Sequence, residues 1–161
     1  SEQDHVTQDF KIVDQPQREQ LEQIEILRSF IHECTGIKDD ADFFIFTGKG
    51  AKGINLNQGQ GYGLHQNLFN EPLSSAVEVF SHEIAHNYGK HSDPEFYNTM
   101  QALLGSTIDK LLKIAKKPDN KRTEQEKRIL ELQEEWNLRA GLPRVGQTNM
   151  QIQKYLATSQ R

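Results

Sequence analysis

The segment that most constrains the fold is a predicted amphipathic helix that carries two histidines off its apolar face. Its apolar residues recur at the i, i+3 and i+4 spacing of one buried stripe, and they are Leu73, Ala76, Val77, Phe80 and Ile84. At about 100° per residue, His82 and His86 point nearly opposite this stripe. Such a helix packs its stripe against a core, and it leaves the two histidines to a role other than core packing.

The two histidines belong to the pentapeptide His82-Glu83-Ile84-Ala85-His86, which is an H-E-x-x-H motif. Because they are four positions apart on a helix, their side chains lie next to each other and can share a metal ion. Two neutral imidazoles suit Zn²⁺, and Glu83 beside them can accept a proton from metal-bound water. The sequence therefore predicts Zn²⁺ as the cofactor, His82 and His86 as ligands, and Glu83 as the general base.

The third metal ligand has several candidates. We favour His91, because it lies just before the next predicted helix and completes a set of three imidazoles that leaves a position for water. Asp93 and Glu95 are alternatives, but each has a structural use: Ser92 with Glu95 forms an S-x-x-E capping box, and Asp93 before Pro94 is a good N-cap. A ligand from elsewhere, such as a glutamate on a later helix, is the remaining alternative.

The first half of the chain predicts one supporting helix and a small sheet. The helix covers residues 16–36, residues 10–13 and 41–47 read as strands, and two further strands are expected within 54–69. Residues 48–53 match G-x-G-x-x-G, but no helix follows them as a nucleotide-binding loop requires, so we interpret them as a turn. The predicted fold class is α+β, with a short, mostly antiparallel sheet, the motif helix and C-terminal helices.

The second half of the chain predicts helices. One helix covers residues 96–115, and a second begins with a capping box formed by Thr123 and Glu126 and ends near Ala140. The basic cluster at 113–122 could contact nucleic acid, but no aromatic residues are interleaved with it, and a solvated linker explains it equally well.

Length, charge and cysteine content exclude several protein classes. A chain of 161 residues with a formal charge of −4 fits one domain with no overall attraction to nucleic acid or anionic membranes. The single cysteine, Cys34, cannot form an internal disulfide, which favours an intracellular, cytoplasmic location. No apolar run approaches a membrane span, so we expect no membrane partner. Because the chain begins with Ser, we expect it to belong to a longer protein.

The motif segment also resembles a known family. The run 77–89 looks like the motif helix of short zinc metallopeptidases of the zincin superfamily, and the run 91–97 is similar to the SprT-like and WLM-like group. The resemblance extends from Phe43 to roughly Leu104. It implies a zinc-dependent metalloendopeptidase that acts on protein or peptide substrates, with His82, His86 and His91 as ligands and Glu83 as general base. It also implies that the strand leading to the motif helix, 62–65, forms an edge along which a peptide can lie.

The sequence departs from related patterns around His91. His91 follows His86 by five positions, whereas the metzincin pattern requires six, and Phe96 lies one position later than is usual in the SprT-like pattern. On this resemblance, residues 1–117 form the zincin-like metallopeptidase domain. Residues 118–161 form a polar helical C-terminal extension that packs on the domain or leads to another, regulatory one. The alternative function is a catalytically silent zinc-binding interaction module.

Hydrolysis would also need a donor for the developing oxyanion. Tyr88, Tyr97 and His65 are candidates only because they are close to the motif in the sequence.

Overall fold

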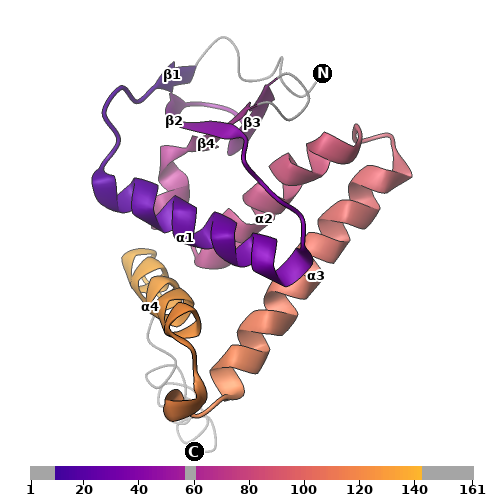
Figure 1. The fold of residues 1–161 in the computed structure, drawn as a ribbon. Helices are drawn as coiled ribbons and strands as arrows, with labels where there is room; N and C mark the ends of the chain where they lie inside the picture. Colours follow the sequence, from indigo (N-terminus) through magenta and orange to yellow (C-terminus); the bar gives the residue numbers. More distant parts are fainter. Residues whose placement is uncertain (1–9, 57–60, 143–161) are drawn as a thin grey trace, which may run out of the picture.

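The computed structural model describes residues 10–56 and 61–142, and it shows an α+β fold as predicted (Figure 1). Within these residues the strands are β1 (Phe10–Ile12), β2 (Asp42–Gly48), β3 (Gly53–Leu56) and β4 (Gly61–His65), and the α-helices are α1 (Arg18–Thr35), α2 (Leu73–Ala85), α3 (Pro94–Lys116) and α4 (Glu124–Arg139). Short 3₁₀ turns are η2 (Gln66–Asn70), η3 (His86–Tyr88) and η4 (Asp119–Lys121). The predicted elements are therefore present among the described residues, and the part of the predicted C-terminal extension from residue 143 onward lies outside them.

The four described strands form one sheet in the order β1-β2-β4-β3. The β1–β2 and β3–β4 pairs are antiparallel and the β2–β4 pair is parallel, so the sheet is mostly antiparallel as expected. The prediction that residues 62–65 form an edge was wrong. They belong to β4, which is paired on both sides, and the edge near the motif helix is β3. Sequence order did not reveal this, because β4 inserts between β2 and β3 and strand order depends on tertiary pairing.

The turn between β2 and β3 is glycine-dependent. Gly48 and Gly50 have φ values of 130° and 123°, which side-chain-bearing residues rarely adopt. Strand β3, and not a helix, begins directly at Gly53. The interpretation of the G-x-G-x-x-G match as a turn is thus confirmed.

The two faces of the sheet have different neighbours. Ile45, Tyr62 and Leu64 join the main core with the buried faces of the helices. Phe46 and Ile54 point to the other face, where Phe10 and Phe44 pack against them. The uninterrupted apolar run Phe43-Phe44-Ile45-Phe46 is explained by this arrangement, because a strand that buries both faces needs apolar residues at successive positions.

Helix α4 packs on the same core and caps the N-terminus of α2, the helix that carries the H-E-x-x-H motif. Ile129, Leu132 and Trp136 are buried in the cluster that also contains residues of α1, α2 and α3. Its predicted capping box is present, with Thr123 N–H donating to Glu126 and Glu126 N–H donating to the Thr123 hydroxyl. The first N–H of α2, that of Leu73, donates to Asn137 Oδ1 at 2.9 Å, so a side chain of α4 caps α2. None of the described helices combines the length and apolarity needed to cross a membrane.

Candidate metal centre

The chain positions its three candidate ligands by ending α2 abruptly. His82 lies in the last turn of α2, His86 begins the 3₁₀ turn η3, and His91 lies in the turn before α3. The sequence predicted an α-helix up to Gly89, but the α-helix ends at Ala85 and the last turn tightens. Gly89 follows this turn in an extended conformation, and the next turn, closed by the Asp93 N–H donating to the Lys90 carbonyl, brings His91 back toward His82.

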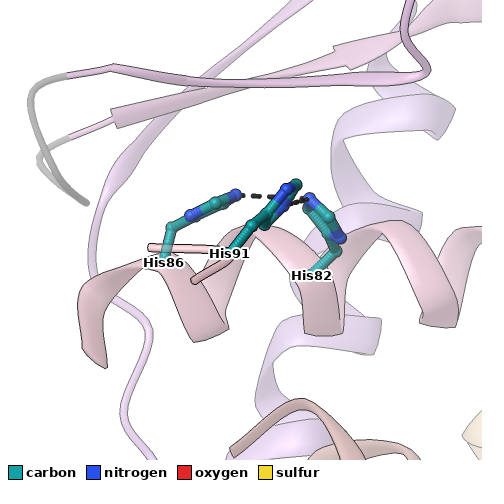
Figure 2. Close-up of side chains that lie close together, drawn as sticks. All are labelled: His82, His86 and His91. Carbon is teal, nitrogen blue, oxygen red and sulfur yellow. Dashed lines mark hydrogen bonds between the residues drawn. The ribbon is translucent and has the colours of Figure 1, made fainter. Parts of the chain in front are cut away.

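The three imidazoles converge on one point, as Figure 2 shows. His82 Nε2 lies 3.2 Å from His86 Nε2 and 2.9 Å from His91 Nε2. All three ligand atoms lie within 4.8 Å of one another. Nitrogens that share a tetrahedral Zn²⁺ at 2.0–2.1 Å are roughly 3.3 Å apart, so this spacing fits such an ion with little movement. The donor set also fits, because three neutral imidazoles leave one coordination position open.

The protonation state of the cluster favours metal binding. Burial, and to a lesser extent charge repulsion from the neighbouring His86 and His91, lower the pKa of His82 to about 4. His82 is therefore neutral at pH 7, and its nitrogen lone pair is available to a metal. His86 Nδ1 lies 3.4 Å from the Gly89 carbonyl oxygen, a long contact that favours a proton on Nδ1 and leaves Nε2 for the metal.

The carboxylates proposed as alternatives to His91 are not brought into the cluster. The Asp93 carboxylate accepts a hydrogen bond from Lys90 N–H at 2.8 Å, and Asp93 N–H donates to the Lys90 carbonyl at the same distance. Asp93 also occupies the N-cap position of α3, although its side chain makes no capping bond there. Glu95 is exposed in the first turn of α3. Among the described residues, the group with metal-binding geometry contains only the three histidines.

Comparisons with known proteins leave this site without a relative. No protein-family model, curated protein or solved structure matches the chain.

Glu83 lies on the side of α2 that faces the edge strand β3. Its side chain is only 4% exposed, and the space in front of its carboxylate is bounded by Gly53 of β3. Its backbone carbonyl accepts a hydrogen bond from Asn55 Nδ2 at 3.2 Å. The carboxylate is therefore buried, and it follows directly after His82, one of the three histidines that could hold a metal ion. The sequence carried no signal for Gly53 or Asn55, because both lie in a glycine-rich run without periodicity.

The three residues suggested as oxyanion donors do not join the cluster. The ring of His65 is engaged on both nitrogens: Nε2 lies 2.7 Å from the Gly48 carbonyl, and Nδ1 accepts from Asn67 N–H at 3.0 Å. This histidine therefore fixes the strand end. Tyr88 and Tyr97 are 45% and 51% exposed on the surface near the site, and Tyr97 packs against Phe96.

The ring of Phe96 packs against the rings of all three histidines. Its ring centroid lies 5.1 Å from that of His82, 4.7 Å from that of His86 and 4.7 Å from that of His91. Phe96 itself is buried at the start of α3. The sequence placed this residue in the apolar stripe of the helix, which is correct, but gave no sign that one ring orients all three imidazoles.

We expect Phe96→Leu to lower zinc affinity by about tenfold or more, because the imidazoles lose the surface that fixes their ring orientations. Competition against a zinc-binding dye measures this change. Phe30→Leu in α1 is the matched control, because Phe30 is also a buried phenylalanine but packs in the main core cluster, to which Phe96 does not belong. Equal zinc affinities of the two variants would contradict the role of Phe96.

Proposed function

We propose that this chain is a zinc-dependent peptidase domain that hydrolyses peptide bonds in protein or peptide substrates. The observation that carries the proposal is the convergence of His82, His86 and His91 on one point, with the buried Glu83 next to His82 in α2. A zinc site that serves only structure is normally closed by a fourth protein ligand and gains nothing from a neighbouring carboxylate. The resemblance of residues 77–97 to SprT-like and WLM-like zincins supports the same function.

The division of labour follows from the placement of the residues. The three histidines would hold Zn²⁺, which supplies a water molecule of lowered pKa and polarises the scissile carbonyl when it is bound. Glu83 takes the proton from the attacking water and then gives it to the leaving amine. Burial of Glu83 against β3 keeps its carboxylate on the strand side of the helix, where a substrate would lie.

The edge strand β3 is the natural place for an extended substrate. His65 N–H donates to the Lys52 carbonyl, one position before the first pair of the β3–β4 register, Gly53 with Leu64. Residues of an antiparallel pair alternate between those that exchange backbone hydrogen bonds and those that do not, so the N–H and C=O of Gly53, the next residue along, point away from β4. A peptide added at this edge would bind through its main chain, with little selection of side chains.

Metal-dependent cleavage of unfolded proteins tests the proposal. We expect the purified protein to cleave a proteome-derived peptide library or denatured casein, to lose this activity with 1,10-phenanthroline, and to regain it with equimolar Zn²⁺. A non-chelating phenanthroline isomer is the control. Tight zinc binding without cleavage of any substrate would favour the silent interaction module instead.

A further inference from the structure

The start of β3 contacts the residue proposed as general base at two points. The strand alternates, so Gly53 and Asn55 face α2 while Ile54 packs on the opposite face of the sheet. Both inward-facing residues meet Glu83, one at its carboxylate and the other at its backbone carbonyl. The strand edge and the motif helix are therefore joined at the residue whose position matters most for the proposed reaction.

Gly53 is required there for space, not for backbone conformation. It has no positive φ, in contrast to Gly48 and Gly50 in the preceding turn. A Cβ atom at Gly53 would lie 2.7 Å from Glu83 Oε1 and 2.8 Å from Val79 Cγ1. These distances are too short for real contacts, so any side chain at this position displaces the Glu83 carboxylate, whose end can rotate, or presses on Val79, whose rotamer is stiff.

Asn55 fixes the other end of the same residue. Helix α2 stops at Ala85, so the carbonyl of Glu83 is among the last four of the helix, which need partners outside a regular α-helix. Asn55 Nδ2 donates to this carbonyl from a position that is buried in the strand. The bond connects the backbone of the last α-helical turn to β3, and it fixes the position of the Glu83 backbone relative to the strand.

We propose that Gly53 and Asn55 are positioning residues for Glu83, with Gly53 providing the space that the carboxylate occupies and Asn55 holding the helix end that carries it. This inference rests on the proposed function, because it assigns the two residues to the general base of that reaction. Both residues contact Glu83, so we expect their effect to fall on the proton transfer that this residue would carry out.

The test is Gly53→Ala in the zinc-loaded protein. We expect kcat to fall on the order of 10²-fold, because a displacement of about 1 Å in a catalytic group costs that much. KM, zinc affinity and the unfolding midpoint should stay near those of the wild type. Gly61→Ala in β4 is the matched control, because a Cβ there meets only the Asp42 carbonyl, at 3.3 Å. An unchanged kcat in Gly53→Ala would overturn the inference.

Two further measurements keep the test decisive. The double variant Gly53→Ala/Val79→Ala removes the second clash, so it folds even if the single variant does not, and its kcat should remain low. Recovery of kcat in the double variant would show that the effect acts through Val79, which overturns the inference. A crystal structure of the metal-free Gly53→Ala protein should show the Glu83 carboxylate displaced, and an unmoved carboxylate also overturns it. This structural result does not depend on activity, so a failure of the peptidase proposal itself is recognised separately, by a wild type that cleaves nothing.

Discussion

Replacing Glu83 with Gln is expected to reduce peptide hydrolysis by about 10²–10⁴-fold while zinc stays bound, because the amide cannot accept the proton of the attacking water. The shape of the side chain is preserved, and the hydrogen bond from Asn55 goes to the backbone carbonyl, so the helix end should be unaffected. The three histidines keep their geometry, since none of them is changed. Activity is thus expected to collapse without a change in metal content.

Zinc content by mass spectrometry and cleavage of the same peptide library give the two readouts for Glu83→Gln. The matched control is Glu78→Gln, which makes the same chemical change on the exposed side of the same helix. The control should retain wild-type activity. Undiminished cleavage by Glu83→Gln would remove the general-base role, and loss of zinc would show that the carboxylate supports the metal site instead.

The features that the sequence predicted well depend on residues that are close together in the chain. The stripe of α2, the capping box of Thr123 with Glu126 and the glycine turn after β2 depend on residues a few positions apart, and all are present. The start of helix α2 is different: its N-cap residue, Pro72, makes no capping side-chain bond, and Asn137 from α4 accepts the first N–H instead. A side chain 64 positions away cannot be recognised from the local pattern.

The parts of the site that the sequence did not reveal depend on long-range packing. Strand β3 became the edge because β4 pairs with β2, and this pairing brought Gly53 and Asn55 to Glu83. Phe96 could be assigned to a core stripe, but its contact with three imidazoles requires the turn at residues 90–93, which brings His91 back toward α2. Local spacing predicts which residues share a helix face, whereas the second layer around the site is set by how separate elements meet.

The other large effect is expected on zinc affinity when His91, the proposed third ligand, is replaced. We expect His91→Ala to weaken zinc binding by more than the roughly 10–100-fold typical of changes next to a metal site, because it removes a nitrogen that lies 2.9 Å from His82 Nε2. Two remaining imidazoles cannot hold the ion with comparable strength. Competition with a zinc-binding dye measures the affinity, and far-ultraviolet circular dichroism verifies that the helices persist.

The variants Asp93→Asn and Glu95→Gln test whether one of these carboxylates, and not His91, is the third metal ligand. Glu95 is exposed, so its variant should bind zinc as the wild type does. Asp93→Asn keeps an oxygen that can accept the Lys90 N–H, so the turn that presents His91 should persist with only a small loss of affinity. If His91→Ala kept full zinc binding while either carboxylate variant lost it, the metal would be held by that carboxylate. Because the Asp93 carboxylate is already bonded to the backbone of the turn, its contribution is to the position of His91, and the order of zinc affinities should be wild type, then Asp93→Asn, then His91→Ala.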